Sequence, residues 1–142
     1  MGKTYQSIVI NAPVEKVWET VRNFHDMSWA PNVITKLEVK GDKQGDQIGA
    51  QRLLNDAFLE TMLELSDLEH TIQYSIDDGP TPISPDDVED YIGSISMIPV
   101  TETDSTFFEW SSSWDSKTDA AEDFCHNIYV AMLADLKKTL EG

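Results

Sequence analysis

The sequence predicts an α+β fold in which a curved antiparallel sheet of seven strands wraps around one long C-terminal helix. Seven segments have the composition and alternation of strands, turns rather than helices join the last six, and the chain ends in a long amphipathic stretch. Parallel strands would need helical crossovers, so strands joined by turns favour an antiparallel sheet. The apolar stripe of the terminal helix must then cover one face of that sheet.

The N-terminal residues predict one strand followed by two short helices. The strand covers Thr4–Asn11 and is rich in β-branched residues. A helix is expected over Pro13–Asn23, because Pro13 suits a first turn and Glu15 complements the positive end of the helix dipole. The segment Phe24–Val33 is expected to form a second short helix or a compact loop.

Six further strands are expected before the last helix. They are predicted at Ile34–Lys40, Ala50–Asn55, Leu59–Ser66, Thr71–Asp77, Tyr91–Val100 and Thr106–Asp115. The segment Asp78–Val88 contains three prolines and is predicted to be a loop. From Asp119 to Leu140 apolar residues recur with a helical period. No linker, repeat or low-complexity segment divides the chain, so residues 1–142 are expected to form a single domain.

Composition and charge limit the classes of partner. The 142 residues are 40% hydrophobic and 25% charged, which is typical of a globular protein. Ten basic against 26 acidic residues give a net charge of −16, which repels nucleic acid and anionic lipid surfaces. No apolar run resembles a signal peptide or a membrane span, so we expect a cytoplasmic protein without membrane insertion. A lone cysteine, Cys125, excludes an intrachain disulfide.

Several motifs resemble those of a known family. The segment Ile10–Trp18 is similar to the "I-x-A-P-x-E-x-V-W" opening of many helix-grip proteins. Three later segments resemble successive strands of the polyketide cyclase/dehydrase branch of the START and Bet v 1-like (SRPBCC) superfamily: Gly49–Arg52, Glu60–Leu65 and Thr71–Ile76. This resemblance covers almost the whole chain and implies a helix-grip fold with a cavity for a small apolar ligand. Members of the family include enzymes, lipid or quinone binders and chaperone cofactors.

Strand alternation predicts which side chains face the last helix. On the strands, this alternation selects as candidate ligand-binding residues Met62, Tyr74, Tyr91, Ile95, Met97, Trp110 and Trp114. Two further candidates, Phe124 and Ile128, are expected opposite them on the last helix. Such a mainly apolar set with a few polar tips suits a small-molecule pocket. A solid core would show the same alternation, and it is the family resemblance that favours a cavity.

The polar candidates are Arg52 and Glu60, which are expected on neighbouring strands joined by a short turn. Arg52 could orient a carboxylate or enolate of a ligand, or the two residues could simply satisfy each other near the mouth of a cavity. Glu64 is expected on the same face as Met62, either as a buried acid or at a solvated strand end. Arg52, Glu64 and His25 are the only candidates for acid–base catalysis, and they would need to converge in space.

No metal or cofactor is expected. The three histidines lack the spacing of a zinc site, and the acidic run Asp86–Asp90 lacks the spaced ligands and the glycine of a calcium loop. The chain also lacks nucleotide-binding glycine motifs and a G-x-S-x-G nucleophile elbow.

The leading functional hypothesis is a carrier or sensor of a small hydrophobic or amphipathic molecule, such as a lipid, a polyketide-like compound or an aromatic. Arg52, Glu60, Tyr74 and Tyr91 would orient that molecule. One alternative is an enzyme, a cyclase, dehydratase or hydrolase, that uses the same cavity. Another is a cochaperone-like interaction module that contacts a protein through the exposed sheet or the last helix.

Overall fold

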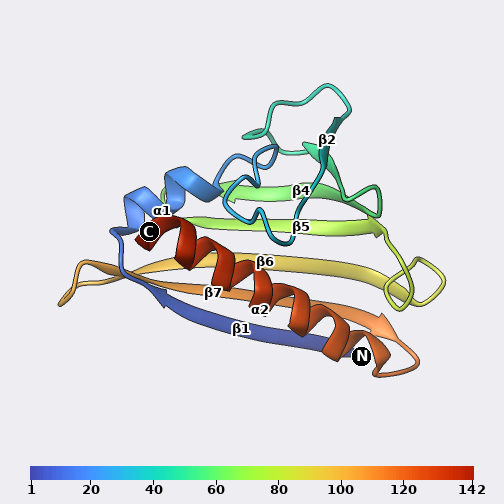
Figure 1. The fold of residues 1–142 in the computed structure, drawn as a ribbon. Coiled ribbons are helices and arrows are strands. Elements are labelled where there is room, and N and C mark those ends of the chain that lie inside the picture. The colour runs from blue at the N-terminus through green and yellow to red at the C-terminus, as the bar shows by residue number, and fades with distance from the viewer.

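A seven-stranded antiparallel sheet curves around one long helix, as the sequence predicts. The computed structural model describes residues 1–142, and Figure 1 shows the last helix lying across the sheet. The elements are β1 (Gly2–Ile10), α1 (Val14–Val21), β2 (Leu37–Lys40), β3 (Gln51–Leu54), β4 (Phe58–Ser66), β5 (Thr71–Asp78), β6 (Val88–Val100), β7 (Ser105–Ser116) and α2 (Ala120–Glu141). The strand order is β1-β7-β6-β5-β4-β3-β2, so only the contact between β1 and β7 joins strands distant in sequence.

The two longest strands, β6 and β7, pair with each other between β1 and β5 and contribute large side chains to the inner face of the sheet. Burial alternates along both strands, so every second side chain points towards α2. Trp110 of β7 and Tyr74 of β5 are almost completely buried on this inner face. Gly93 of β6 pairs with Tyr74 and has no side chain to obstruct the tyrosine ring.

The expectation of two short helices after the first strand is corrected to one. α1 forms and buries Trp18, whose indole Nε1 donates a hydrogen bond of 2.8 Å to Asp67. The segment 24–33 is a series of turns. Side-chain oxygens compete there with helical hydrogen bonding, because Asn23 accepts from the backbone N–H of His25 and Asp26 from that of Ser28.

The strand expected at Ile34–Lys40 begins three residues later, at Leu37. Asn55, in the turn after β3, explains the delay. Its Oδ1 accepts hydrogen bonds from the backbone N–H groups of Thr35 and Lys36, at 2.8 and 3.2 Å, and its Nδ2 donates to the carbonyl of Val33 at 2.8 Å. The segment 33–36 is therefore held against this turn rather than in the sheet.

Neither helix has the length and hydropathy of a membrane-spanning helix.

Candidate functional site

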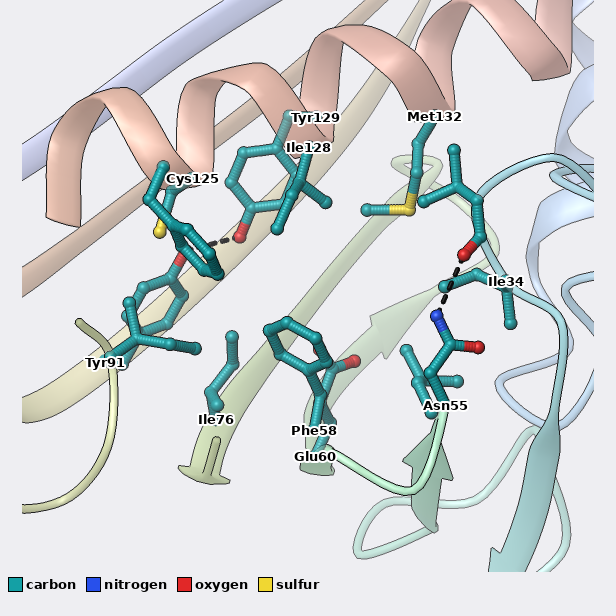
Figure 2. A pocket seen from close by; sticks show the side chains of 14 residues that line it. Ile34, Asn55, Phe58, Glu60, Ile76, Tyr91, Cys125, Ile128, Tyr129 and Met132 are labelled. Atoms are coloured by element: carbon teal, nitrogen blue, oxygen red, sulfur yellow. Dashed lines mark hydrogen bonds between the residues drawn. The ribbon is translucent and has the colours of Figure 1, made fainter. Parts of the chain in front are cut away.

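An apolar cavity of about 220 Å³ lies between α2 and the inner face of the sheet. Figure 2 shows Phe58 and Glu60 of β4 across this cavity from Ile128 and Tyr129 of α2. Twelve of the fourteen residues that line it are hydrophobic. The lining residues are Phe124, Cys125, Ile128, Tyr129 and Met132 from α2, Leu54, Phe58, Glu60, Ile76 and Tyr91 from strands, and Val33, Ile34, Asn55 and Ile83 from loops.

The cavity is displaced from the middle of the sheet because large aromatic side chains fill the middle. Trp110 lies 4.8 Å from Tyr129 and 6.3 Å from Trp29, measured between ring centroids, and the ring of Tyr74 meets it edge-on at 6.5 Å. The space left among these rings is only about 10 Å³. That volume is at the lower limit for one water molecule.

The structure divides the predicted ligand-binding residues into two groups. Glu60, Tyr91, Phe124 and Ile128 line the cavity. The others lie in the packed part of the core or at its edge and do not line it: Arg52, Met62, Tyr74, Ile95, Met97, Trp110 and Trp114. Strand alternation thus identifies the inner face, whereas side-chain volume decides where on that face space remains.

Arg52 and Glu60 form a buried ion pair between directly opposed positions of β3 and β4. Nε and Nη2 of Arg52 lie 2.8 and 2.6 Å from the same carboxylate oxygen, Oε1. The guanidinium also covers the ring of Phe24, at 3.8 Å from its centroid, and Nη1 donates to the Phe24 carbonyl at 3.2 Å. Burial raises the pKa of Glu60, and the positive charge of Arg52 offsets only part of that effect.

Three tyrosines form a hydrogen-bonded chain that runs from Tyr74 in the packed core to Tyr129 and Tyr91 on the cavity wall. The hydroxyl of Tyr129 lies 2.9 Å from that of Tyr74 and 2.5 Å from that of Tyr91. Trp110 donates its indole N–H to Tyr74 at 2.9 Å, and Tyr91 donates to Ser112 at 3.1 Å. Burial raises the pKa of each of the three phenols, so they are neutral at physiological pH.

The three candidates for acid–base catalysis do not converge on the cavity. Glu64 is exposed, because a bulge between Met62 and Glu64 interrupts the alternation of β4. His25 is half-buried, and its Nε2 lies 3.0 Å from the backbone carbonyl oxygen of Gln51. Arg52 lies behind Glu60 and does not line the cavity. No group of three histidine, cysteine or acidic side chains is arranged to hold a metal ion.

Several lining residues were not predicted as a site. Tyr129 follows Cys125 by four positions, and this helical spacing would have placed both on the buried stripe of α2. Phe58 lies at the start of β4, one position before the predicted strand. Asn55 and Ile83 belong to loops, where no sequence periodicity indicates which way a side chain points.

Solved structures resemble this chain over nearly its full length. A protein from Nitrosospira multiformis is 45% identical, with 97% of this chain and 95% of that chain covered and a TM-score of 0.96. XoxI from Bacillus cereus is 23% identical, with 99% and 96% covered and a TM-score of 0.79. Major latex-like protein 151 from Panax ginseng is 13% identical, with 98% and 97% covered and a TM-score of 0.77. The last two similarities concern the fold alone.

No curated protein matches the sequence. Residues 1–141 match the family described as "Polyketide cyclase / dehydrase and lipid transport". The match spans the strands, the long helix and the cavity between them. The chain therefore belongs to the polyketide cyclase/dehydrase and lipid transport family.

Proposed function

We propose that the protein is a carrier or sensor that binds one small hydrophobic or amphipathic molecule in the cavity beside α2. The observation that carries this proposal is a space of about 220 Å³ whose walls are almost entirely apolar. Burying the apolar surface of a ligand there removes it from water and supplies the affinity. The family description, which includes lipid transport, agrees with such a role.

The volume limits the size of the ligand. An apolar protein cavity of about 150 Å³ accommodates benzene. The cavity beside α2, at about 220 Å³, is therefore matched to a single aromatic ring with a small substituent, or to a short aliphatic chain. A long acyl chain exceeds it.

An enzyme that uses the same cavity is the second candidate function. It is favoured by one observation: Glu60 is a buried carboxyl group on the cavity wall whose pKa is raised by burial. A buried carboxyl group with a raised pKa on a cavity wall is a candidate to exchange a proton with a bound molecule. His25 and Glu64 lie outside the cavity, so Glu60 would have to act without either of them.

A pair of tryptophan substitutions on α2 tests the carrier proposal. Ile128→Trp places an indole in the cavity, whereas Val130→Trp places one on the exposed side of the same helix. Calorimetric titration with toluene should show one site in the wild type and in Val130→Trp, and at least a tenfold weaker site in Ile128→Trp. Absence of toluene binding to the wild type, or equal binding by both variants, would contradict the proposal.

The carrier and enzyme candidates differ in what happens to a bound molecule. Native mass spectrometry of the protein purified from its own host, followed by extraction, identifies any endogenous ligand. A carrier should return that compound unchanged after prolonged incubation with excess protein. Conversion to a product that Glu60→Gln no longer forms would instead establish the enzyme.

A further inference from the structure

The polar atoms on the cavity wall differ in whether they have hydrogen-bonding partners. Apart from hydrophobic side chains, the wall contains Asn55 and Glu60, with the hydroxyls of Tyr91 and Tyr129 and the thiol of Cys125 on otherwise apolar residues. The amide oxygen of Asn55 accepts hydrogen bonds from the backbone N–H groups of Thr35 and Lys36, and its nitrogen donates one hydrogen to the carbonyl of Val33. Asn55 therefore offers a ligand no free acceptor, and only one N–H donor remains.

The tyrosine hydroxyls have no proton left to donate. The indole N–H of Trp110 can only donate, so Tyr74 accepts from it. At the other end, Tyr91 uses its single proton on Ser112. Tyr91 must therefore accept from Tyr129, and Tyr129 must accept from Tyr74. The chain runs in one direction, and each phenol proton is already used inside the protein.

Among the side-chain oxygens of the cavity wall, only Oε2 of Glu60 has no hydrogen-bond partner. Both contacting nitrogens of Arg52 approach Oε1, and Oε2 has no hydrogen-bond partner. The residue is only 5% exposed and forms part of the cavity wall. Trp114 Nε1 is the one side-chain nitrogen or oxygen that is both fully buried and without a partner, so Oε2 of Glu60 keeps some accessible surface. A ligand in the cavity could therefore donate a hydrogen bond to Oε2.

The charge of the pair indicates which donor fits best. Arg52 already neutralises Glu60, so an ammonium ion would bring an uncompensated charge into an apolar space, at a large desolvation cost. A carboxylate ligand would meet the negative oxygen of Glu60 rather than the guanidinium of Arg52, which lies behind it. A neutral hydroxyl group avoids both penalties.

We propose that the cavity selects a small neutral molecule with a hydroxyl group, in particular a single-ring phenol, whose hydroxyl donates a hydrogen bond to Oε2 of Glu60. The ring would lie among Phe58, Phe124 and Ile128, which are apolar walls of the same cavity. This inference rests on the proposed ligand-binding function and adds the chemical class of the ligand.

Five probes of similar size test the inference at pH 8 by calorimetric titration. They are 4-methylphenol, its methyl ether 4-methylanisole, toluene, 4-methylbenzoate and 4-methylbenzylamine. A hydrogen bond to a charged acceptor should make 4-methylphenol bind roughly ten- to a hundredfold more tightly than toluene or 4-methylanisole. The benzoate should bind more weakly than toluene, and the amine more weakly than the phenol.

The variant Glu60→Gln tests the acceptor itself. Its amide oxygen can accept from Arg52, which directs the amide nitrogen, a donor, at the cavity. The preference for 4-methylphenol over toluene should then fall by at least tenfold, with toluene affinity retained. The comparison of 4-methylphenol with 4-methylanisole needs only the wild type, so the inference can be tested even if the variant does not fold.

The outcomes separate this inference from the proposed function. If toluene binds but 4-methylphenol binds no better than 4-methylanisole, the cavity is a ligand site and the role of Glu60 is overturned. Tighter binding of the amine or of the benzoate than of the phenol overturns the neutral hydroxyl class. If none of the five probes binds, the proposed function itself fails.

Discussion

Arg52 places two of its nitrogens, Nε and Nη2, against a single oxygen of Glu60, at 2.8 and 2.6 Å, and leaves the other carboxylate oxygen on the wall of an apolar cavity. The ring of Phe24 covers the guanidinium, at 3.8 Å from its centroid. The pair of a carboxylate and a guanidinium is therefore neutral as a whole and buried. It is also asymmetric, because Arg52 contacts only one of the two carboxylate oxygens of Glu60. Its stability, its titration and its effect on a ligand can each be measured.

Removal of Arg52 should strongly destabilise the protein. The variant Arg52→Met leaves the carboxylate of Glu60 buried without a countercharge, which should lower the free energy of unfolding by about 3–5 kcal/mol at pH 7.5. Urea denaturation provides the measurement. Lys36→Met is the matched control, because Lys36 pairs with Asp56 and Glu38 on the exposed surface, where solvent screens the pairs, and its loss should change stability far less. Equal losses in both variants would show that the buried pair is not important for stability.

Glu60 should make the protein less stable as pH rises. Burial raises its pKa in the folded state above the unfolded value of about 4.3, so the folded state retains the proton over the interval between the two values. Its contribution to stability is fully present below the unfolded value and is lost as pH rises through the folded value. The variant Glu60→Gln has no such titration.

The measurement is the difference in unfolding free energy between wild type and Glu60→Gln, taken from urea titrations at several pH values from 4 upwards. Subtracting the variant removes the contribution of the other acidic residues. The wild type should lose stability relative to the variant as pH rises. If the wild type instead gains stability relative to Glu60→Gln as pH rises, the charge of Arg52 outweighs burial and lowers the pKa of Glu60.

Gly93→Ala should disturb the tyrosine chain from outside the cavity. A Cβ atom at this position would lie 2.2 Å from Cζ and 2.6 Å from the hydroxyl oxygen of Tyr74, so the ring would have to move. We expect a loss of about 1–3 kcal/mol in unfolding free energy and a weaker near-ultraviolet circular dichroism signal. Ser96→Ala, on the opposite face of β6, should change stability by less than about 0.5 kcal/mol. An unchanged signal in Gly93→Ala would show that the site tolerates a methyl group.

Cys125 should react slowly and report on occupancy of the cavity. Burial raises the pKa of its thiol, and the side chain lines the cavity beside Tyr91. Alkylation by iodoacetamide at pH 8 should be roughly tenfold or more slower in the folded protein than in urea, because the thiolate is scarce and access is restricted. Saturating 4-methylphenol should slow the folded-state reaction further. If 4-methylphenol slows the alkylation of Cys125 as much in Ile128→Trp as in the wild type, the ligand binds outside this cavity.

Much of the fold follows from periodicity. The regular spacing of apolar residues in α2 and their alternation in β6 and β7 identify the elements and the inner face of the sheet. The exceptions arise where side chains bond to the backbone. Asn55 holds the segment 33–36 away from β2, and Asn23 and Asp26 turn the chain where a helix was expected. Periodicity carries no signal for such local hydrogen bonds.

The candidate site was predictable only in part. Tyr91 and Ile128 follow from alternation and helical spacing, and both line the cavity. Trp110 follows from the same pattern yet fills the space in which a ligand was expected. Whether an inward side chain lines a cavity or occupies it depends on three-dimensional packing volume, which a one-dimensional pattern does not contain.

Methyl-resolved NMR of the methionines tests most directly whether the cavity beside α2 accepts an apolar molecule. Met132 lines the cavity, whereas Met97 is buried in the core away from it and serves as an internal control. With toluene as the titrant, the Met132 methyl signal should shift and saturate with one equivalent bound, and the Met97 signal should move much less. An unperturbed Met132 signal at the solubility limit of toluene, or equal shifts of both methyl groups, would contradict a ligand site in this cavity.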